Sequence, residues 1–233
     1  MKYLYFILAT LTVLSCRNGM RGSGNIIKET RQLAEINSVS VSGSIKVDVK
    51  TGMVPSLTVE ADDNIILYVV TNVSDKNLSI KLKGISNLRN ATVRIYLVVP
   101  TLNKISTSAS AELRSSEAIT NSDKISFTAS SGSLINVNVD APTISAGGSS
   151  GAEIILKGRT KNLTAVSSSG SDVSLFSLQA ENATASASSG AEISVFGSVK
   201  INASASSGAK VIYKGGASSV VKNVSSGGSV NPE

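Results

Sequence analysis

Four charged residues with regular spacing are the side chains of this 233-residue chain that could do chemistry: Glu153, Asp172, Glu192 and Lys210. Each stands two residues after a glycine, 18 to 20 residues from the next. If the chain coils with that period, they form an outward column with about 4.8 Å between neighbours. Like charges at that spacing repel each other unless water, salt or a bound cation screens them. The column is therefore a weak candidate ladder for Ca²⁺ or a cationic ligand. The alternative is a row of solvated carboxylates that keeps a sheet soluble.

The same column bears on catalysis. Glycosidases use two carboxylates about 5 Å or 6.5–9.5 Å apart, and adjacent members of the column could meet either spacing. Sugar sites also contain aromatic rings, but Phe176 and Phe196 hold the same position in two successive repeats, which favours local packing near a turn. The chain has no His and one Cys, which excludes Ser-His-Asp and Cys-His catalysis and an intrachain disulfide. We expect a non-enzymatic protein with no catalytic residues, no metal and no cofactor, with a carbohydrate-active enzyme as the alternative.

The start of the chain predicts export. An apolar run from Leu4 to Leu14 follows a basic start and is too short to cross a bilayer as a helix. It ends in Ser15-Cys16, which resembles the bacterial lipobox, so we predict a lipoprotein signal peptide over residues 1–15 and lipidation of Cys16. The alternative is an ordinary signal peptide followed by a chance cysteine. Residues 16–25 have the composition of a flexible tether.

The predicted location is the cell envelope. No Asp follows Cys16 directly, which favours an outer-membrane lipoprotein over one retained in an inner membrane. The acidic tether that many surface-displayed lipoproteins carry is also missing, so the periplasmic and surface faces both stay open.

The C-terminal half repeats itself. Ser-Ser-Gly or a near copy recurs at intervals of 19, 19, 20, 18 and 19 residues, and apolar side chains keep fixed offsets from each glycine. Because these side chains alternate with polar ones, each repeat is made of strands, and a fixed period near 20 residues is typical of a solenoid. We expect one coil per repeat, with the aligned side chains stacked in continuous apolar ladders. The glycines are Gly132, Gly151, Gly170, Gly190, Gly208 and Gly227, and the first ladder is Ile135, Ile154, Val173, Ile193, Val211 and Val230.

The composition agrees with a narrow core. Hydrophobic residues make up 41% of the chain but aromatic residues only 4%. Small side chains at some inward positions would let narrow coils reach native packing density. The recurring glycine is expected at a corner that needs a positive φ. Low-complexity disorder is the alternative, and the aligned apolar columns argue against it.

The N-terminal half is also strand-like. Residues 26–100 lack the period but contain alternating runs separated by turn residues. We place a boundary near Pro100 and the solenoid repeats over residues 101–233. The two parts are expected to form one continuous domain over residues 26–233, in which the N-terminal strands extend or cap the solenoid, because an uncapped end coil leaves backbone edges unpaired.

The net charge of +6 and the isoelectric point near 9.4 raise the question of nucleic-acid binding. The lysines and arginines are spread along the chain without a dense basic and aromatic cluster. A solvated strand face, or attraction to an anionic envelope surface, explains them better. We therefore expect no nucleic-acid partner.

Several motifs in order resemble a known family. Gly-Ser-Gly-Asn-Ile at 22–26 precedes a strictly alternating run at 39–49, Leu-Thr-Val-Glu-Ala-Asp-Asp-Asn-Ile at 57–65, a strand ended by Pro100, and the serial Ser-Ser-Gly units. Together they resemble the bacterial exported proteins described as auto-transporter adhesin, head GIN domain, over residues 22 to 230. The family usually has Ser-Gly-Ser-Gly where this chain has Ser-Ser-Gly-Ala.

The resemblance implies a right-handed parallel β-helix-like fold and an extracytoplasmic location, mostly in Bacteroidetes-type bacteria. It brings no catalytic residues, and its adhesin label is an inference from fold, which does not fix function. The hypothesis from the sequence is thus a lipid-anchored β-solenoid that acts as a binding, adhesin-like or structural module. Its expected partners are the membrane, through the lipid anchor, and a glycan or protein of the envelope.

Overall fold

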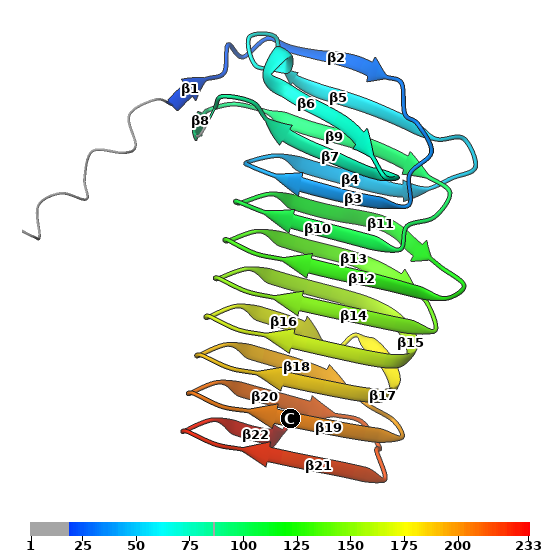
Figure 1. Ribbon diagram of the computed structural model, residues 1–233, viewed down its shortest axis with the longest axis vertical. Helices are drawn as coiled ribbons and strands as arrows, with labels where there is room; N and C mark the ends of the chain where they lie inside the picture. The colour runs from blue at the N-terminus through cyan, green and yellow to red at the C-terminus, as the bar shows by residue number, and fades with distance from the viewer. Residues whose placement is uncertain (1–18, 86) are drawn as a thin grey trace, which may run out of the picture.

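The computed structural model describes residues 19–85 and 87–233. They form β-strands almost throughout, with one short 3-10 helix, η1 (Ile66–Tyr68). The predicted all-β solenoid is confirmed, because parallel strands about 20 residues apart pair over about six turns of the C-terminal half (Figure 1). The predicted signal peptide, residues 1–15, and the predicted lipidation site, Cys16, lie outside the described residues. Among the residues that are described, no helix is long and apolar enough to cross a membrane.

Each coil contributes one strand to each of two faces, which we call face A and face B. The strand β15 belongs to both, because its first part pairs with β13 and its second part with β14. Face A runs, in order of pairing, through β2 (Ile26–Arg31), β5 (Ser56–Asp62), β9 (Val93–Val99), β4 (Lys46–Thr51), β11 (Glu112–Thr120), β13 (Leu134–Asp140), β15 (Glu153–Ser167), β16 (Asp172–Leu175), β18 (Glu192–Phe196), β20 (Lys210–Lys214) and β22 (Ser229–Pro232).

Face B is built in the same way. It runs through β6 (Val69–Ser74), β7 (Asn77–Leu82), β3 (Ser38–Ser42), β10 (Lys104–Ser108), β12 (Lys124–Ala129), β14 (Thr143–Gly148), the second part of β15, β17 (Leu178–Ala187), β19 (Lys200–Ala205) and β21 (Ser219–Val224). A separate parallel pair joins β1 (Gly19–Arg21) to β8 (Asn87–Arg89). Chain order and spatial order therefore agree in the C-terminal half and differ in the N-terminal half.

The core is a set of apolar ladders between the two faces. Ile154, Val173 and Ile193 are in register on successive strands, and none of them has exposed surface. Burial of one such side chain contributes about 1.5–3 kcal/mol. On face B a column of small residues faces inward, at Ala146, Ala165, Ala185 and Ala203. The predicted stacking of aliphatic side chains in a narrow interior is confirmed.

The Ser-Ser-Gly segments form tight turns at one edge of the coils. In the turn at 149–152 both central residues have positive φ, 52° at Ser150 and 68° at Gly151, and the Ala152 amide donates to the Ser149 carbonyl over 3.2 Å. This is a type I′ turn, which favours Gly at its second central position. The amide of Gly151 also donates to the Ser169 carbonyl of the next coil over 3.1 Å. The same bond is repeated at the turns of Gly132, Gly170, Gly190 and Gly208. The predicted positive φ of the glycine is confirmed, and the preceding serine shares it.

The N-terminal strands close one end of the solenoid (Figure 1). The layer of β3 and β4 lies between the first repeat layer, β10 and β11, and the later strands β7 and β9. Beyond them β5 and β2 on face A and β6 on face B run antiparallel to their neighbours. Because antiparallel strands end the parallel register, they cap the stack at this end.

Two of the family motifs, residues 22–26 and 57–65, are joined by hydrogen bonds on this cap. The carboxylate of Asp62, which is buried, accepts hydrogen bonds from the amides of Gly24 and Thr92, both over 2.7 Å. Asp63 accepts from the Ser23 hydroxyl over 2.6 Å and from the Asn25 amide group over 2.9 Å, and these bonds lower the pKa of its carboxyl. The part of the expected tether that the structure describes, residues 19–25, is thus held against the cap by strand pairing and by these bonds.

Candidate functional site

The carboxylates singled out in the sequence form one column on face A. Glu153, Asp172 and Glu192 are in register on β15, β16 and β18, and Lys210 follows on β20. The ammonium of Lys210 lies 3.6 Å from the Glu192 carboxylate and offsets that end of the column. Within residues 19–85 and 87–233, no group of three or more His, Cys, Asp or Glu side chains is arranged to hold a metal ion. What the column does show is electrostatic repulsion.

Asp172 lies between the two other carboxylates of the column, Glu153 and Glu192. Its partial burial, and then the neighbouring carboxylates of Glu192 and Glu153, raise the pKa of Asp172 above the ordinary value of 3.8. A carboxyl with a raised pKa binds its proton more tightly in the folded state than in the unfolded chain. The folded state therefore gains stability as the pH falls from the folded to the unfolded pKa, and loses it as the pH rises.

Replacing Asp172 by Asn should accordingly raise the melting temperature slightly at pH 7, because it removes one member of a repelling set. The advantage should shrink as the pH falls below the folded pKa of Asp172 and disappear below 3.8. Thermal melts of both proteins across this pH range measure the effect, with Asp123→Asn, at an exposed position, as control. A variant that is less stable than the parent at pH 7 would contradict the assignment.

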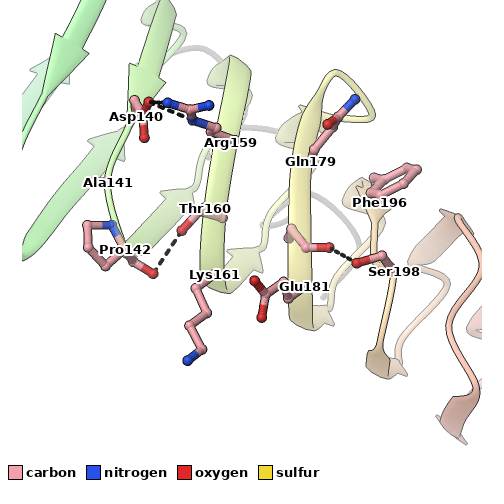
Figure 2. Close-up of a pocket in the computed structure, with 11 residues that line it drawn as sticks. Asp140, Ala141, Pro142, Arg159, Thr160, Lys161, Gln179, Glu181, Phe196 and Ser198 are labelled. Carbon is pink, nitrogen blue, oxygen red and sulfur yellow. Dashed lines mark hydrogen bonds and ion pairs between the residues drawn. The ribbon is translucent and has the colours of Figure 1, made fainter.

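A groove at the edge opposite the Ser-Ser-Gly turns is a second candidate site (Figure 2). Its volume is about 580 Å³, and it extends over the corners of successive coils. It is lined by Asp140, Ala141, Pro142, Arg159, Thr160, Lys161, Gln179, Ala180, Glu181, Phe196 and Ser198.

The groove presents several kinds of recognition group. Asp140, Arg159 and Gln179 are in register on β13, β15 and β17. The guanidinium of Arg159 donates through both Nε and Nη2 to one oxygen of Asp140, each over 2.7 Å. The Arg159 side chain is 77% exposed, so this ion pair adds little to stability and instead holds a planar donor group at the groove. Figure 2 shows the ring of Phe196 at the other end.

The backbone of the groove is fixed by local bonds. The Thr160 hydroxyl donates to the Pro142 carbonyl over 3.1 Å, and the Ser198 hydroxyl to the Ala180 carbonyl over 3.3 Å (Figure 2). Both bonds join one coil to the next, so the corners hold their relative positions. The groove therefore has a preformed shape, as ligand sites usually do.

Sequence reasoning missed this groove. Asp140, Arg159 and Gln179 stand eight, eight and nine residues after their repeat glycines, so extending the repeat alignment would have placed them together. Phe196, which the sequence predicts to pack locally near a turn, lines the groove. The ring of Phe176 lies beneath the ammonium of Lys214, which is 4.4 Å from its centroid.

Face B carries a second kind of surface, made of hydroxyl groups. Outward side chains in register on four successive strands, β12, β14, β15 and β17, are all Ser or Thr, and Lys104 on β10 precedes them in the same column. Neighbours in such a column stand about 4.8 Å apart, on a flat polar surface. The four are Ser126, Ser145, Thr164 and Thr184.

Comparison with solved structures supports the fold. A putative adhesin from Bacteroides fragilis has a TM-score of 0.85 at 17% identity, over 92% of this chain and 100% of that one. A putative lipid binding protein from Parabacteroides distasonis has a TM-score of 0.74 at 20% identity, over 93% and 100%. A putative adhesin from Parabacteroides merdae has a TM-score of 0.74 at 14% identity, over 93% and 100%. At these identities the likeness concerns the fold alone.

Comparison with curated proteins gave no match. A family model does match, over residues 35–217, and its description is putative auto-transporter adhesin, head GIN domain. The match covers the chain from β3 to β20, which is most of the cap and most of the repeats, in agreement with the resemblance of the motifs. The chain therefore belongs to the auto-transporter adhesin, head GIN domain family.

Proposed function

We propose that this protein is a lipid-anchored, non-enzymatic binding module of the cell envelope, and that its corner groove binds a glycan. The observation that carries the proposal is the groove itself, where an exposed guanidinium, an amide, three further charged groups and an aromatic ring lie within one preformed space. Hydroxyl-rich ligands are recognised by such planar donors and acceptors together with a ring face. The adhesin description of the family supports binding over turnover.

The chemistry of the groove also favours binding over hydrolysis. A glycosidase needs one carboxyl that donates a proton and a second that acts as base or nucleophile. Asp140 is already engaged by Arg159 in two hydrogen bonds, which leaves Glu181 as the remaining carboxyl of the groove. A single free carboxyl supports orientation of a ligand better than acid–base catalysis.

A glycan array with the purified protein tests this proposal. We expect a subset of glycans to bind, and Arg159→Ala to weaken that binding about 10-fold or more, because a charged hydrogen bond contributes about 1.5–3 kcal/mol. The matched control is Arg114→Ala, which removes an exposed arginine that pairs with Glu112 on face A. Equal loss in both variants, or release of reducing ends from the bound glycan, would contradict the groove as a binding site.

Anchoring requires its own test. The sequence Ser15-Cys16 after an apolar run supports lipidation, and more than one acyl chain would give a firm membrane anchor. We expect a labelled fatty acid to enter the protein in cells and to be lost in Cys16→Ala, with the protein moving from the membrane to the soluble fraction. Unlabelled parent protein would remove the anchor from the proposal and leave the groove unaffected.

A further inference from the structure

The two ends of the solenoid are finished differently. The N-terminal end is covered by antiparallel strands, whereas β21 and β22 form the last layer at the other end (Figure 1). Among the described residues, β21 pairs only with β19 and β22 only with β20. All six residues of β21 are exposed, including Val220 and Val224, which continue inward columns. An exposed edge of this kind is a template for pairing with another strand.

One inward column changes its chemistry at this last layer. The column of Ala146, Ala165, Ala185 and Ala203 continues with Lys222 on β21. The ammonium of Lys222 lies 4.8 Å from the centroid of the Tyr213 ring on β20. The lysine stem therefore crosses beneath the core toward the opposite face, with its charge over an aromatic ring. A further layer stacked on this end would bury the ammonium without a carboxylate, which is costly.

The other strand of the last layer carries a second obstacle. Pro232 stands in register with Tyr213 and has no amide hydrogen. The next residue, Glu233, donates its amide to the Tyr213 carbonyl over 3.0 Å, toward β20. Successive amides of a strand point in opposite directions. Because the amide of Glu233 points toward β20, an amide at position 232 would point away from β20, toward the unpaired edge of β22. The missing donor is thus on the side where a new strand would pair.

We propose that Lys222 and Pro232 prevent the C-terminal end of the solenoid from pairing with the same end of a second copy. A twofold end-to-end dimer would bring two identical edges together. It would also bring two Lys222 ammonium groups into one interface, where like charges repel. Inward charges and edge prolines are devices that natural edge strands use against association. The second copy is the fitting partner, because its strands carry the same inward alternation of side chains.

The test restores the repeat pattern at the last layer. The variant Lys222→Ala/Pro232→Val gives the column its alanine and the edge its amide. Its molar mass is measured by light scattering at high micromolar protein concentration, beside the parent and a control variant. The control is Lys200→Ala, which removes an exposed lysine from β19, the strand that pairs with β21. We expect the double variant to double its mass while the other two remain monomeric. A dimeric parent, or a folded double variant that stays monomeric, overturns the proposal.

Two further measurements keep the test decisive. The amides of Val220 and Val224 should exchange quickly with solvent in the parent and slowly in the dimer, because dimer formation pairs this edge. Should the double variant lose its last layer, Lys222→Met/Pro232→Val decides, since it keeps an aliphatic stem over Tyr213 while it removes the charge and restores the edge amide. Association of this variant, with Lys222→Arg/Pro232→Val remaining monomeric, supports the proposal. A folded Lys222→Met/Pro232→Val that stays monomeric overturns it.

Discussion

Replacing Gly158 by alanine is expected to lower the free energy of unfolding by about 3–5 kcal/mol, the range of severe single substitutions. Gly158 stands in β15 at a corner of its coil with a φ of +123°, which L side chains rarely adopt. A Cβ placed there would lie 2.0 Å from the carbonyl oxygen of Val139 on the preceding coil. No rotamer change relieves a clash with backbone, so the variant must separate β13 from β15 locally. Urea denaturation of parent and variant measures the loss.

Gly151→Ala is the matched control for this experiment. Gly151 also has a positive φ, +68°, but nothing lies within 4 Å of the position its Cβ would take. Its substitution should cost only the strain of a left-handed conformation, about 1–2 kcal/mol. If the two variants lose equal stability, the close approach of two coils at Gly158 does not determine the effect.

Phe127→Ala should cost about 3–5 kcal/mol. Phe127 on β12 has no exposed surface and is among the largest fully buried side chains of the protein. It lies in register between Ile105 and Ala146 on neighbouring layers, so the small alanine makes room for the ring. Truncation leaves a cavity that two strands of a rigid ladder cannot close. Calorimetry or urea denaturation provides the measurement.

Two other substitutions serve as controls for the Phe127→Ala prediction. Phe127→Leu keeps most of the volume and should cost clearly less than the alanine variant. Phe196→Ala removes a half-buried ring at the groove and should change stability little. A loss at Phe196 as large as the loss at Phe127 would mean that burial does not account for the ranking.

The repeat part of the fold could be predicted because the spacing of its glycines gives the length of one coil. A fixed spacing of glycines aligns Ile154, Val173 and Ile193, and coils that stack in register must bring such residues together. The positive φ of Ser150 was not predicted, since it follows from the type I′ turn as a whole and serine gives no signal for it.

The cap was beyond such reasoning. Residues 26–100 have no period, so nothing in the sequence says that β3 and β4 lie between β10–β11 and β7–β9. The bonds between residues 22–25 and residues 62–64 join two motifs that lie about 40 residues apart in the chain. Pairing of that kind depends on tertiary contacts and not on local pattern.

The candidate sites could be predicted only in part, because only some of their residues share one offset from the repeat glycine. Glu153, Asp172 and Glu192 share one repeat offset, so their column was predictable from spacing. The groove combines Arg159 and Phe196 from different offsets and different coils, and it exists only once the corners have a shape. Side chains that meet across a corner leave no common spacing in the sequence.

The hydrogen bonds that join the turn at Gly151 to the next turn along the edge are repeated, with nearly the same geometry, at Gly132, Gly170, Gly190 and Gly208. Each repeat therefore meets its neighbours through an almost identical junction, and a whole repeat can be duplicated or deleted without disturbing either end. Each such event changes the height of the molecule by about 4.8 Å. Copy number thus sets the distance between the corner groove and the N-terminal cap, and proteins with more or fewer repeats would hold the groove at different heights.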